Sequence, residues 1–222
     1  MSQHEPVIES RRLELHHISA PDLITLFEDR DDAPAISERG FTNPLRVLID
    51  FQGPLAWRVP QVKADPTCNK WFVRWIVLKE KQEIIGSTSF HGAPDSDGAL
   101  EIGLGIESEY QNQGFAKEAL LGMWRWALTF PEVQTFRYTV SPDNLASIAL
   151  INYFGFEYKG QQMADIDGAE NIYQMSAADF IARWIFAGEH VSAIRWLVIP
   201  IVLGALLFYF RGVLTAEMQF GA

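Results

Sequence analysis

The stretch that most constrains the fold covers residues 101–119, EIGLGIESEYQNQGFAKEA. It places a short apolar strand, residues 102–106, directly before a polar glycine turn and a helix. A strand that leads through such a turn into a helix leaves several backbone N–H groups unpaired and pointing the same way, with the positive end of the helix dipole behind them. Gly114 and the small Ala116 let an anion approach the backbone closely. The stretch therefore predicts a pyrophosphate-binding turn.

The composition is that of a globular protein with one domain of ordinary size and an appendage. The chain has 222 residues, 48% of them apolar, and its fifteen Phe and seven Trp can fill a sizeable core. A formal net charge of −10 argues against nonspecific binding to nucleic acid. Cys68 is the only cysteine, so no intrachain disulfide can form, which fits a reducing cytosol. The first residues lack the apolar core of a signal peptide, so none is predicted.

The segments before the glycine turn are of two kinds. Residues 12–18 predict a strand, and Ser19 is the expected N-cap of a helix that continues to Phe27. Residues 33–70 are interrupted by glycine and proline, and we expect only a short helix there, over residues 44–51. Long connections without clear elements are often functional, so we expect this segment to form one wall of a substrate cleft.

Three strands with short connections follow, over residues 71–78, 83–90 and 99–106, which is typical of an antiparallel meander. After the glycine turn and its helix, residues 133–140 are rich in β-forming side chains and predict another strand. Residues 145–154 predict a helix that Gly155 ends. Shorter strands over residues 156–159 and 171–175 complete the pattern.

Residues 84–156 resemble the GNAT superfamily of acyl-coenzyme A-dependent N-acetyltransferases. Gln111, Gly114 and Ala116 fill the family's coenzyme pattern, Gln/Arg-x-x-Gly-x-Gly/Ala. Within the superfamily, the chain is most similar to the RimJ/RimL branch, which acetylates the N-termini of ribosomal proteins. The string SPDNLASIALINYFGF matches that branch's Asn-x-x-Ser helix ending in Gly-Phe, and the resemblance covers roughly residues 8–180.

The resemblance implies an α/β (α+β) fold, with a mixed, mostly antiparallel sheet that is splayed open in the middle and flanked by helices. Acetyl-CoA is the implied co-substrate, bound in the splay, and no metal is implied. The apolar strand is expected to run beside the pantetheine arm, the turn to hold the pyrophosphate, and the later helix start to contact the coenzyme. The residues that this assigns to coenzyme binding are Ile102, Leu104, Ile106, Gln111, Asn112, Gln113, Gly114, Phe115, Ala116, Lys117 and Asn144.

Acetylation of an amine by a thioester needs removal of a proton from the amine, polarisation of the carbonyl oxygen and stabilisation of the leaving thiolate. Glu101, at the start of the central strand, is the candidate base or amine-orienting carboxylate, with a solvated strand-end glutamate as the alternative. His91 is a candidate for the same proton path, or a solvated loop residue. Many GNAT enzymes place a general-acid Tyr where this chain has Ile151, so Ser147 remains as the polar candidate for the thiolate. Its alternative role is to bond the backbone of its own helix.

The C-terminal tail differs from the rest of the chain. Residues 196–210, WLVIPIVLGALLFYF, are uncharged and apolar, and Arg195 and Arg211 bracket them. That run is short of the ~20 residues that cross a bilayer, but residues 191–214 are long enough if both arginines reach the interfaces. A membrane span, a buried core or dimer helix and an in-plane helix stay open; the aromatic ends favour the span. We predict a GNAT domain over residues 1–187 and a C-terminal hydrophobic helix over residues 188–222 as a transmembrane anchor.

These features together predict an N-acetyltransferase that moves acetyl from acetyl-CoA to a primary amine, either a protein N-terminus or a small molecule. Its main domain is expected in the cytoplasm, tethered to the membrane by a single-pass C-terminal anchor, and nucleic acid is not an expected partner. The alternative is a catalytically weak or inactive GNAT-like subunit or assembly factor, docked to a membrane protein complex through the tail.

Overall fold

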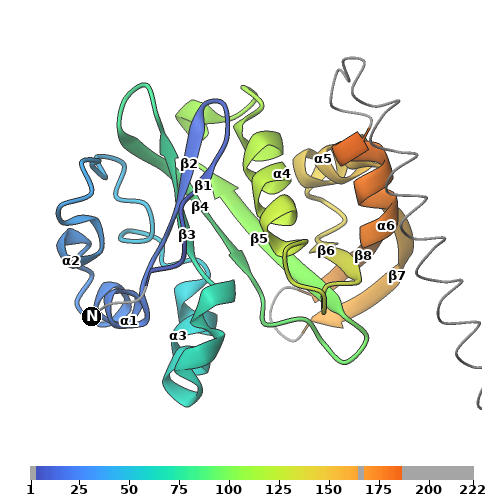
Figure 1. Ribbon diagram of the computed structural model, residues 1–222, viewed down its shortest axis with the longest axis horizontal. Helices are drawn as coiled ribbons and strands as arrows, with labels where there is room; N and C mark the ends of the chain where they lie inside the picture. The colour runs from blue at the N-terminus through green and yellow to red at the C-terminus, as the bar shows by residue number, and fades with distance from the viewer. Residues whose placement is uncertain (1–3, 165–167, 187–222) are drawn as a thin grey trace, which may run out of the picture. The chain divides into compact units, whose positions relative to one another are not determined.

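The computed structural model describes residues 4–164 and 168–186, and within them the strands form one sheet (Figure 1). The strands lie in the order β1-β2-β3-β4-β5-β6-β8-β7. Their bounds are β1 Ile8–Glu9, β2 Leu13–His17, β3 Arg74–Leu78, β4 Glu83–Phe90, β5 Ala99–Ile106, β6 Thr135–Val140, β7 Glu157–Ala164 and β8 Gly168–Ser176. The predicted strands are confirmed, with the last two longer than expected.

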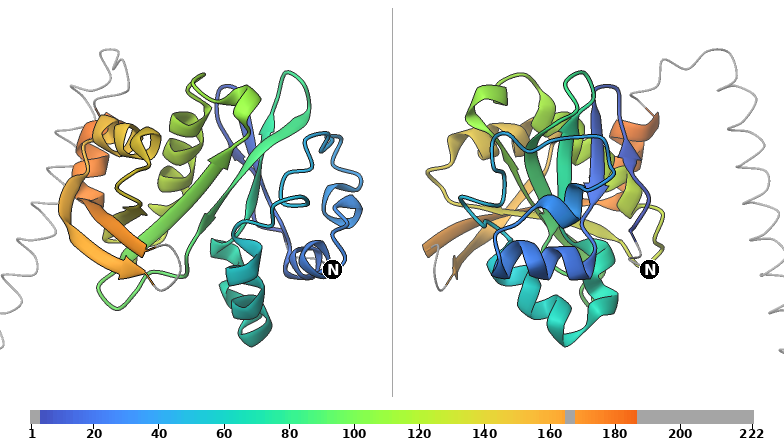
Figure 2. Two further views of the ribbon diagram at one scale, coloured as in Figure 1. Left: turned by 180° about the vertical axis from the view of Figure 1, so that it is seen from behind. Right: turned by 90° about the vertical axis from the view of Figure 1, so that its left-hand side faces the viewer.

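The central strand β5 is shared between two halves of the sheet. Its residues Ile102 to Ile106 pair antiparallel with β4, whereas Ala99 to Glu101 pair parallel with β6. All other neighbouring strands are antiparallel. Figures 1 and 2 show β5 crossing between the two halves. The sheet is therefore mixed, mostly antiparallel and open beside the second half of β5, as predicted.

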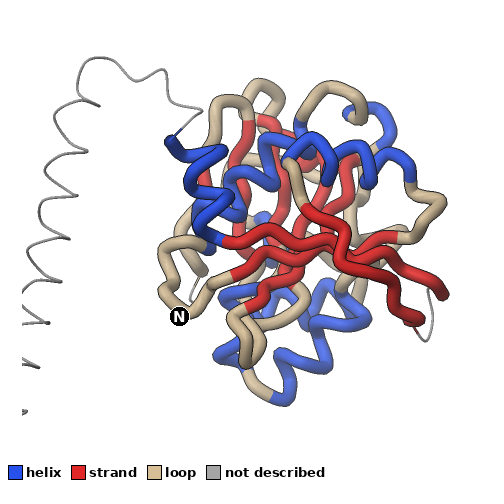
Figure 3. Tube along the Cα trace, turned by 90° about the vertical axis from the view of Figure 1, so that its right-hand side faces the viewer, coloured by secondary structure: helices blue, strands red, loops and turns tan. Residues whose placement is uncertain are grey.

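Helices lie on both sides of the strands (Figure 3). Ser19 begins α1 as predicted, because its hydroxyl accepts a hydrogen bond from the Asp22 N–H. Gly155 ends α5 with φ of 82°, a left-handed conformation that glycine adopts without strain. The helical segments are α1 Ala20–Glu28, α2 Ala33–Ile36, α3 Leu55–Ala64, η1 Pro66–Trp71, η2 Ser108–Tyr110, α4 Phe115–Ala127, α5 Leu145–Phe154, α6 Ala177–Phe180 and the π-helical η3 Ile181–Phe186.

The segment over residues 33–70 differs from the prediction. The short helix expected over residues 44–51 is wrong: these residues form turns, with positive φ at Arg46 and Leu48. The helix is instead α3, which starts after Pro54 and accommodates Pro60 inside it. Leu55, Val59 and Val62 recur at helical spacing and are buried, and they hold α3 against the core despite its prolines.

Aromatic side chains fix α4, the helix that follows the glycine turn. Trp124 of α4 is 1% exposed, and its ring centroid lies 4.8 Å from that of Phe154 and 5.8 Å from that of Phe136. These contacts join α4 to α5 and β6. Because such large rings leave little freedom in a packed core, the N-terminus of α4 is held in place beside β5.

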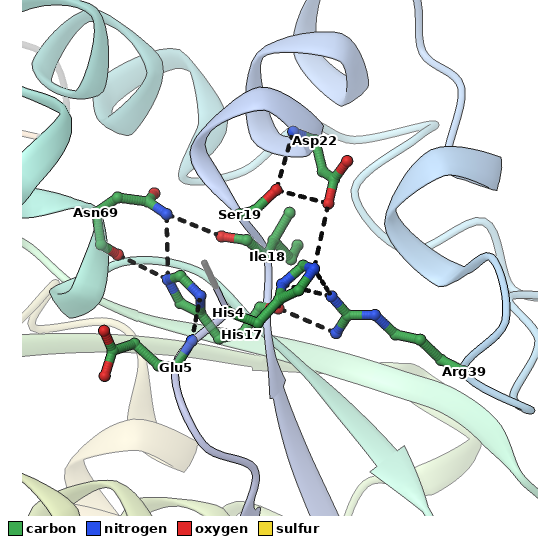
Figure 4. Close-up of polar contacts among 8 residues, drawn as sticks. All are labelled: His4, Glu5, His17, Ile18, Ser19, Asp22, Arg39 and Asn69. Atoms are coloured by element: carbon green, nitrogen blue, oxygen red, sulfur yellow. Dashed lines mark hydrogen bonds and ion pairs between the residues drawn. The ribbon is translucent and has the colours of Figure 1, made fainter. Parts of the chain in front are cut away.

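A buried polar cluster joins the end of β2 to the segment that follows α3 (Figure 4). Nδ1 of His17 accepts from the backbone N–H of Glu5 at 3.2 Å, so the ring proton lies on Nε2, 2.9 Å from the carbonyl oxygen of Asn69. The Asn69 amide in turn donates to the carbonyl oxygen of Ile18 at 3.1 Å. Burial lowers the pKa of His17 to about 4, so the ring is neutral near pH 7.

The chain divides into two units, Met1–Asp179 and Phe180–Ala222. The elements that concern the site belong to the first unit. No helix in the part that the structure describes has both the length and the apolar character needed to cross a membrane. The predicted tail helix, residues 188–222, lies outside the described residues.

Candidate active site

The predicted pyrophosphate turn lies between η2 and α4. Gly114 is the N-cap of α4, and its φ of 81° is in the left-handed region that glycine favours. The first hydrogen bond of the helix runs from the Glu118 N–H to the Gly114 carbonyl oxygen, at 3.2 Å. The N–H groups of residues 112–117 thus have no hydrogen-bond acceptor among the described residues. They form the open cluster of donors that the sequence predicts.

Arg12, which lies just before β2 and far from the turn in sequence, contacts the turn through its guanidinium. Its Nε lies 2.7 Å from a carboxylate oxygen of Glu118, and its Nη1 donates to the Gln113 carbonyl oxygen at 3.0 Å. Its guanidinium also lies 4.3 Å from the ring centroid of Phe115. Arg12 thus holds the turn and the first turn of α4 together, with its charge balanced by Glu118. Its role was not predicted, because no local sequence pattern links positions so far apart.

The second half of β5 offers an unpaired edge next to the turn. Its register places the peptide groups of Gly103 and Gly105 toward β4, so those of Leu104 and Ile106 point to the opposite side. Pairing with β6 stops at Glu101, and no described strand covers this edge further on. The Gln111 side-chain amide donates to the Ile106 carbonyl oxygen at 2.8 Å. The peptide groups of Leu104 are therefore the ones left unpaired at this edge.

The polar side chains at the start of α5 have partners within the chain. The Asn144 side-chain oxygen accepts from the Ser147 N–H at 3.1 Å, which makes it the N-cap. Burial raises the pKa of Tyr138, and the neighbouring Ser147 side chain opposes this shift by hydrogen bonding to the phenol oxygen. Ile151 is buried in the core. From α4, the Lys117 ammonium lies 3.5 Å from the Tyr153 ring centroid.

Glu101 and His91 meet at the branch point of the sheet. Nδ1 of His91 lies 3.0 Å from a Glu101 carboxylate oxygen, to which the Thr139 hydroxyl also donates. Burial by itself would raise the pKa of Glu101. The hydrogen bond and charge of His91, then Thr139 and Arg137, outweigh burial and lower this pKa. Glu101 is therefore charged at neutral pH, and a Cβ on Gly103 would lie only 3.1 Å from His91 Nε2.

His91, Glu101, Thr139 and the second half of β5 line a cleft of about 900 Å³, a volume typical of small-molecule sites. The N–H cluster of residues 112–117, Arg12 and the start of α5 are not among its lining residues. One wall comes from residues 45–58, within the segment expected to build it. The floor is the open half of β5, with Ser87 and Ser89 of β4 beside it. Arg58, which α3 brings to this cleft, was not predicted from the sequence, although the helical spacing of the apolar residues around it was an available signal. Among the described residues, no group of three His, Cys, Asp or Glu could hold a metal ion.

Comparison with known proteins gives the family. The acetyltransferase (GNAT) domain model matches residues 12–157. The chain belongs to the GNAT acetyltransferase family. A relative in Bacillus subtilis, the uncharacterized N-acetyltransferase YjdG, is 33% identical over 153 residues, which cover 68% of this chain and 89% of YjdG. These matches identify the chain as an N-acetyltransferase of the GNAT type.

Solved structures agree in fold. The ribosomal-protein acetyltransferase RimL in complex with coenzyme A is similar with a TM-score of 0.53 and 17% identity, over 77% of this chain and 98% of RimL. The microcin self-immunity acetyltransferase MccE, in complex with acetyl-CoA and AMP, has a TM-score of 0.52 and 18% identity, over 75% of this chain and 93% of MccE. At these identities the likeness shows the GNAT fold alone.

Proposed function

We propose that this GNAT domain transfers the acetyl group of acetyl-CoA to a primary amine. The proposal rests on two neighbouring sets of backbone groups without hydrogen-bond partners in the described residues. One is the N–H cluster of residues 112–117, and the other is the open edge of β5 at Leu104. A pyrophosphate needs the first and the amides of a pantetheine arm can pair with the second. Both sets lead toward Glu101, where the cleft for an acceptor begins.

The chain's own groups divide the binding of the coenzyme between them. The N–H groups from Asn112 to Lys117, with Gly114 and Ala116 allowing close approach, hold the diphosphate. Lys117 adds positive charge, and Arg12, paired with Glu118, keeps the turn in place. Ile102, Leu104 and Ile106 align the arm along β5. Asn144, whose side-chain oxygen is engaged as the cap of α5, contacts the coenzyme at the start of that helix.

Glu101 and His91 handle the proton of the amine. The attacking nitrogen must lose a proton as the N–C bond forms and the C–S bond breaks. The charged Glu101 carboxylate holds an ammonium group at the cleft and orients the His91 imidazole through Nδ1, so that the other ring nitrogen accepts the proton. The Ser147 hydroxyl donates a hydrogen bond to the departing thiolate, which then takes a proton from solvent.

The test is a calorimetric titration with acetyl-CoA, followed by an assay of thiol release over a panel of small amines and peptides. We expect binding and acceptor-dependent release of one thiol per acetylated amine. No binding at millimolar coenzyme would refute the enzymatic proposal. Binding without thiol release across the panel would instead favour an accessory role for the domain.

We further propose that the tail tethers this domain to a membrane, with the domain over residues 1–187 in the cytoplasm, where acetyl-CoA is made. The support is the uncharged apolar run over residues 196–210 between two arginines. Deleting residues 192–222 should release the protein from membranes with coenzyme affinity unchanged. Aggregation of the shortened chain would show that the tail belongs to a core.

A further inference from the structure

Arg58 of α3 is a buried cation at the cleft without a protein partner. The residue is 6% exposed, yet its side chain makes no hydrogen bond and no ion pair within 4.0 Å among the described residues. Its guanidinium carbon lies 5.7 Å from the ring centroid of Phe72, which packs it without neutralising it. Leaving a buried charge unpaired is costly, so this guanidinium has a strong need for an anion.

The other arginines show that Arg58 is a special case. Arg74 is more deeply buried, at 0% exposed, and its Nε and Nη2 also lack hydrogen-bond partners. Its Nη1, however, donates to the carbonyl oxygens of Pro6 and Leu15 at 2.9 and 3.3 Å, and Arg74 does not line the cleft. Arg46 lines the cleft, but its Nε lies 2.8 Å from a carboxylate oxygen of Asp50. Among the described arginines of the cleft, Arg58 alone combines burial with a missing partner.

Glu101 interacts with Arg58 through the cleft without pairing with it. Burial lowers the pKa of Arg58 to about 10 and the charge of Glu101 raises it, so Arg58 is charged at neutral pH. The two groups are farther apart than an ion pair, and both line the cleft. A molecule with an ammonium group at Glu101 and an anionic group at Arg58 would neutralise both charges at once.

We infer that the acceptor is a small primary amine that carries a carboxylate, of the amino acid class, with the carboxylate held by Arg58. The inference rests on the proposed acetyl transfer, since the amine is placed at Glu101. One unpaired guanidinium matches one carboxylate, whereas a phosphate of higher charge would meet the carboxylates of Asp50, Glu107 and Glu170 in the same lining.

The apolar side chains of the cleft provide a surface on which the side chain of the acceptor can bind. Phe51 and Trp57 line the cleft with 83% and 51% of their surface exposed, although large apolar side chains are normally covered. Both stand beside Arg58 in the same wall, so an acceptor with an apolar or aromatic side chain would cover them. A polyamine would instead bring positive charge against Arg58, and an internal peptide bond would leave Arg58 unpaired.

The experiment compares amino acids with their own amides. The full chain and acetyl-CoA are assayed with phenylalanine, leucine and their primary amides, and kcat/KM is corrected for the unprotonated fraction of each amine. The amide keeps the amine and the side chain and lacks the carboxylate. We expect wild type to prefer the acids by about tenfold to a hundredfold, the worth of a charge-assisted hydrogen-bonded pair.

Arg58→Met should abolish this preference, mainly by raising KM for the acids, and Arg58→Lys should retain part of it. Arg46→Met is the matched control: it removes a cleft arginine that is already paired, and the preference should persist. Thermal melting and coenzyme titration report folding; if Arg58→Met does not fold, the wild-type comparison and Arg58→Lys decide.

Acids and amides used equally by wild type, or an undiminished preference in a folded Arg58→Met, would overturn the inference and leave acetyl transfer standing. An acidic peptide preferred over free amino acids would also overturn it. Failure of coenzyme binding, or no thiol release with any amine, refutes the proposed function and the inference with it.

Discussion

Substitutions at Gly114 test whether the turn before α4 binds a pyrophosphate. A Cβ at this position would meet its nearest neighbour, Nη2 of Arg12, at 3.5 Å, which is an ordinary contact. Gly114→Ala therefore costs only the strain of a side chain at φ of 81°, about 1 kcal/mol of unfolding free energy. We expect its affinity for acetyl-CoA to fall by no more than a few-fold.

Gly114→Glu adds a negative charge where the diphosphate is expected. Two like charges about 4 Å apart repel by roughly 1 kcal/mol in water and roughly 4 kcal/mol near a protein surface, which corresponds to about a fivefold to a thousandfold loss of affinity. Gly114→Gln is the matched control, because it has nearly the same bulk and backbone strain without the charge. Calorimetric titration of the three variants, with melting curves for stability, separates these effects.

The series has two outcomes that would contradict the reasoning. If folded Gly114→Glu binds acetyl-CoA within about threefold of wild type, the diphosphate does not lie at this turn. If Gly114→Gln loses as much affinity as Gly114→Glu, the turn binds through its shape and the N–H cluster has little electrostatic role.

Three further predictions concern separate parts of the domain. Between pH 6.5 and 4 His17 is protonated in the unfolded chain and neutral in the folded chain, so the unfolding free energy should fall by up to about 3 kcal/mol as the pH decreases. Denaturant titrations of wild type and His17→Gln at several pH values check this. Equal slopes of unfolding free energy against pH for the two proteins would refute it. Gly103→Ala should displace His91 and lower kcat about tenfold without changing coenzyme affinity; an unchanged kcat would remove His91 from the proton path. Ser147→Ala should lower kcat about tenfold, and equal kcat would exclude Ser147 as thiolate donor.

Local signals made the coenzyme side of the domain predictable. The strand, glycine turn and helix around Gly114 follow one another in sequence, and Gly155 marks the end of α5 by the same left-handed conformation. Each of these depends on neighbouring residues, so a single sequence carries the information. The resemblance to the family then supplied the splay of the sheet, which the split pairing of β5 confirms.

The acceptor side of the domain was harder to predict, because its contacts join positions far apart in the sequence and because prolines obscure the pattern of its helix. Pro54 and Pro60 suggested an irregular segment, while tertiary packing of three buried apolar side chains keeps α3 helical. The brace between Arg12 and Glu118 and the placement of Arg58 at the cleft arise only when the sheet is assembled. Single charged residues of this kind have no periodicity in the sequence. The cleft wall formed by residues 45–58 was therefore predicted, whereas the position of Arg58 in it was not.

The substitution of the family's tyrosine by Ile151 changes where a proton donor must stand. Ser147 lies four residues earlier on α5, one turn away on the same face. Its hydroxyl is hydrogen bonded to Tyr138 of β6, and burial raises the pKa of that phenol, so the phenol keeps its proton above neutral pH. A phenol from the sheet is thus linked to α5 at Ser147, one turn before Ile151. Ile151 therefore does not by itself argue for an inactive domain. Stabilisation of the leaving thiolate depends instead on the pair formed by Ser147 and Tyr138.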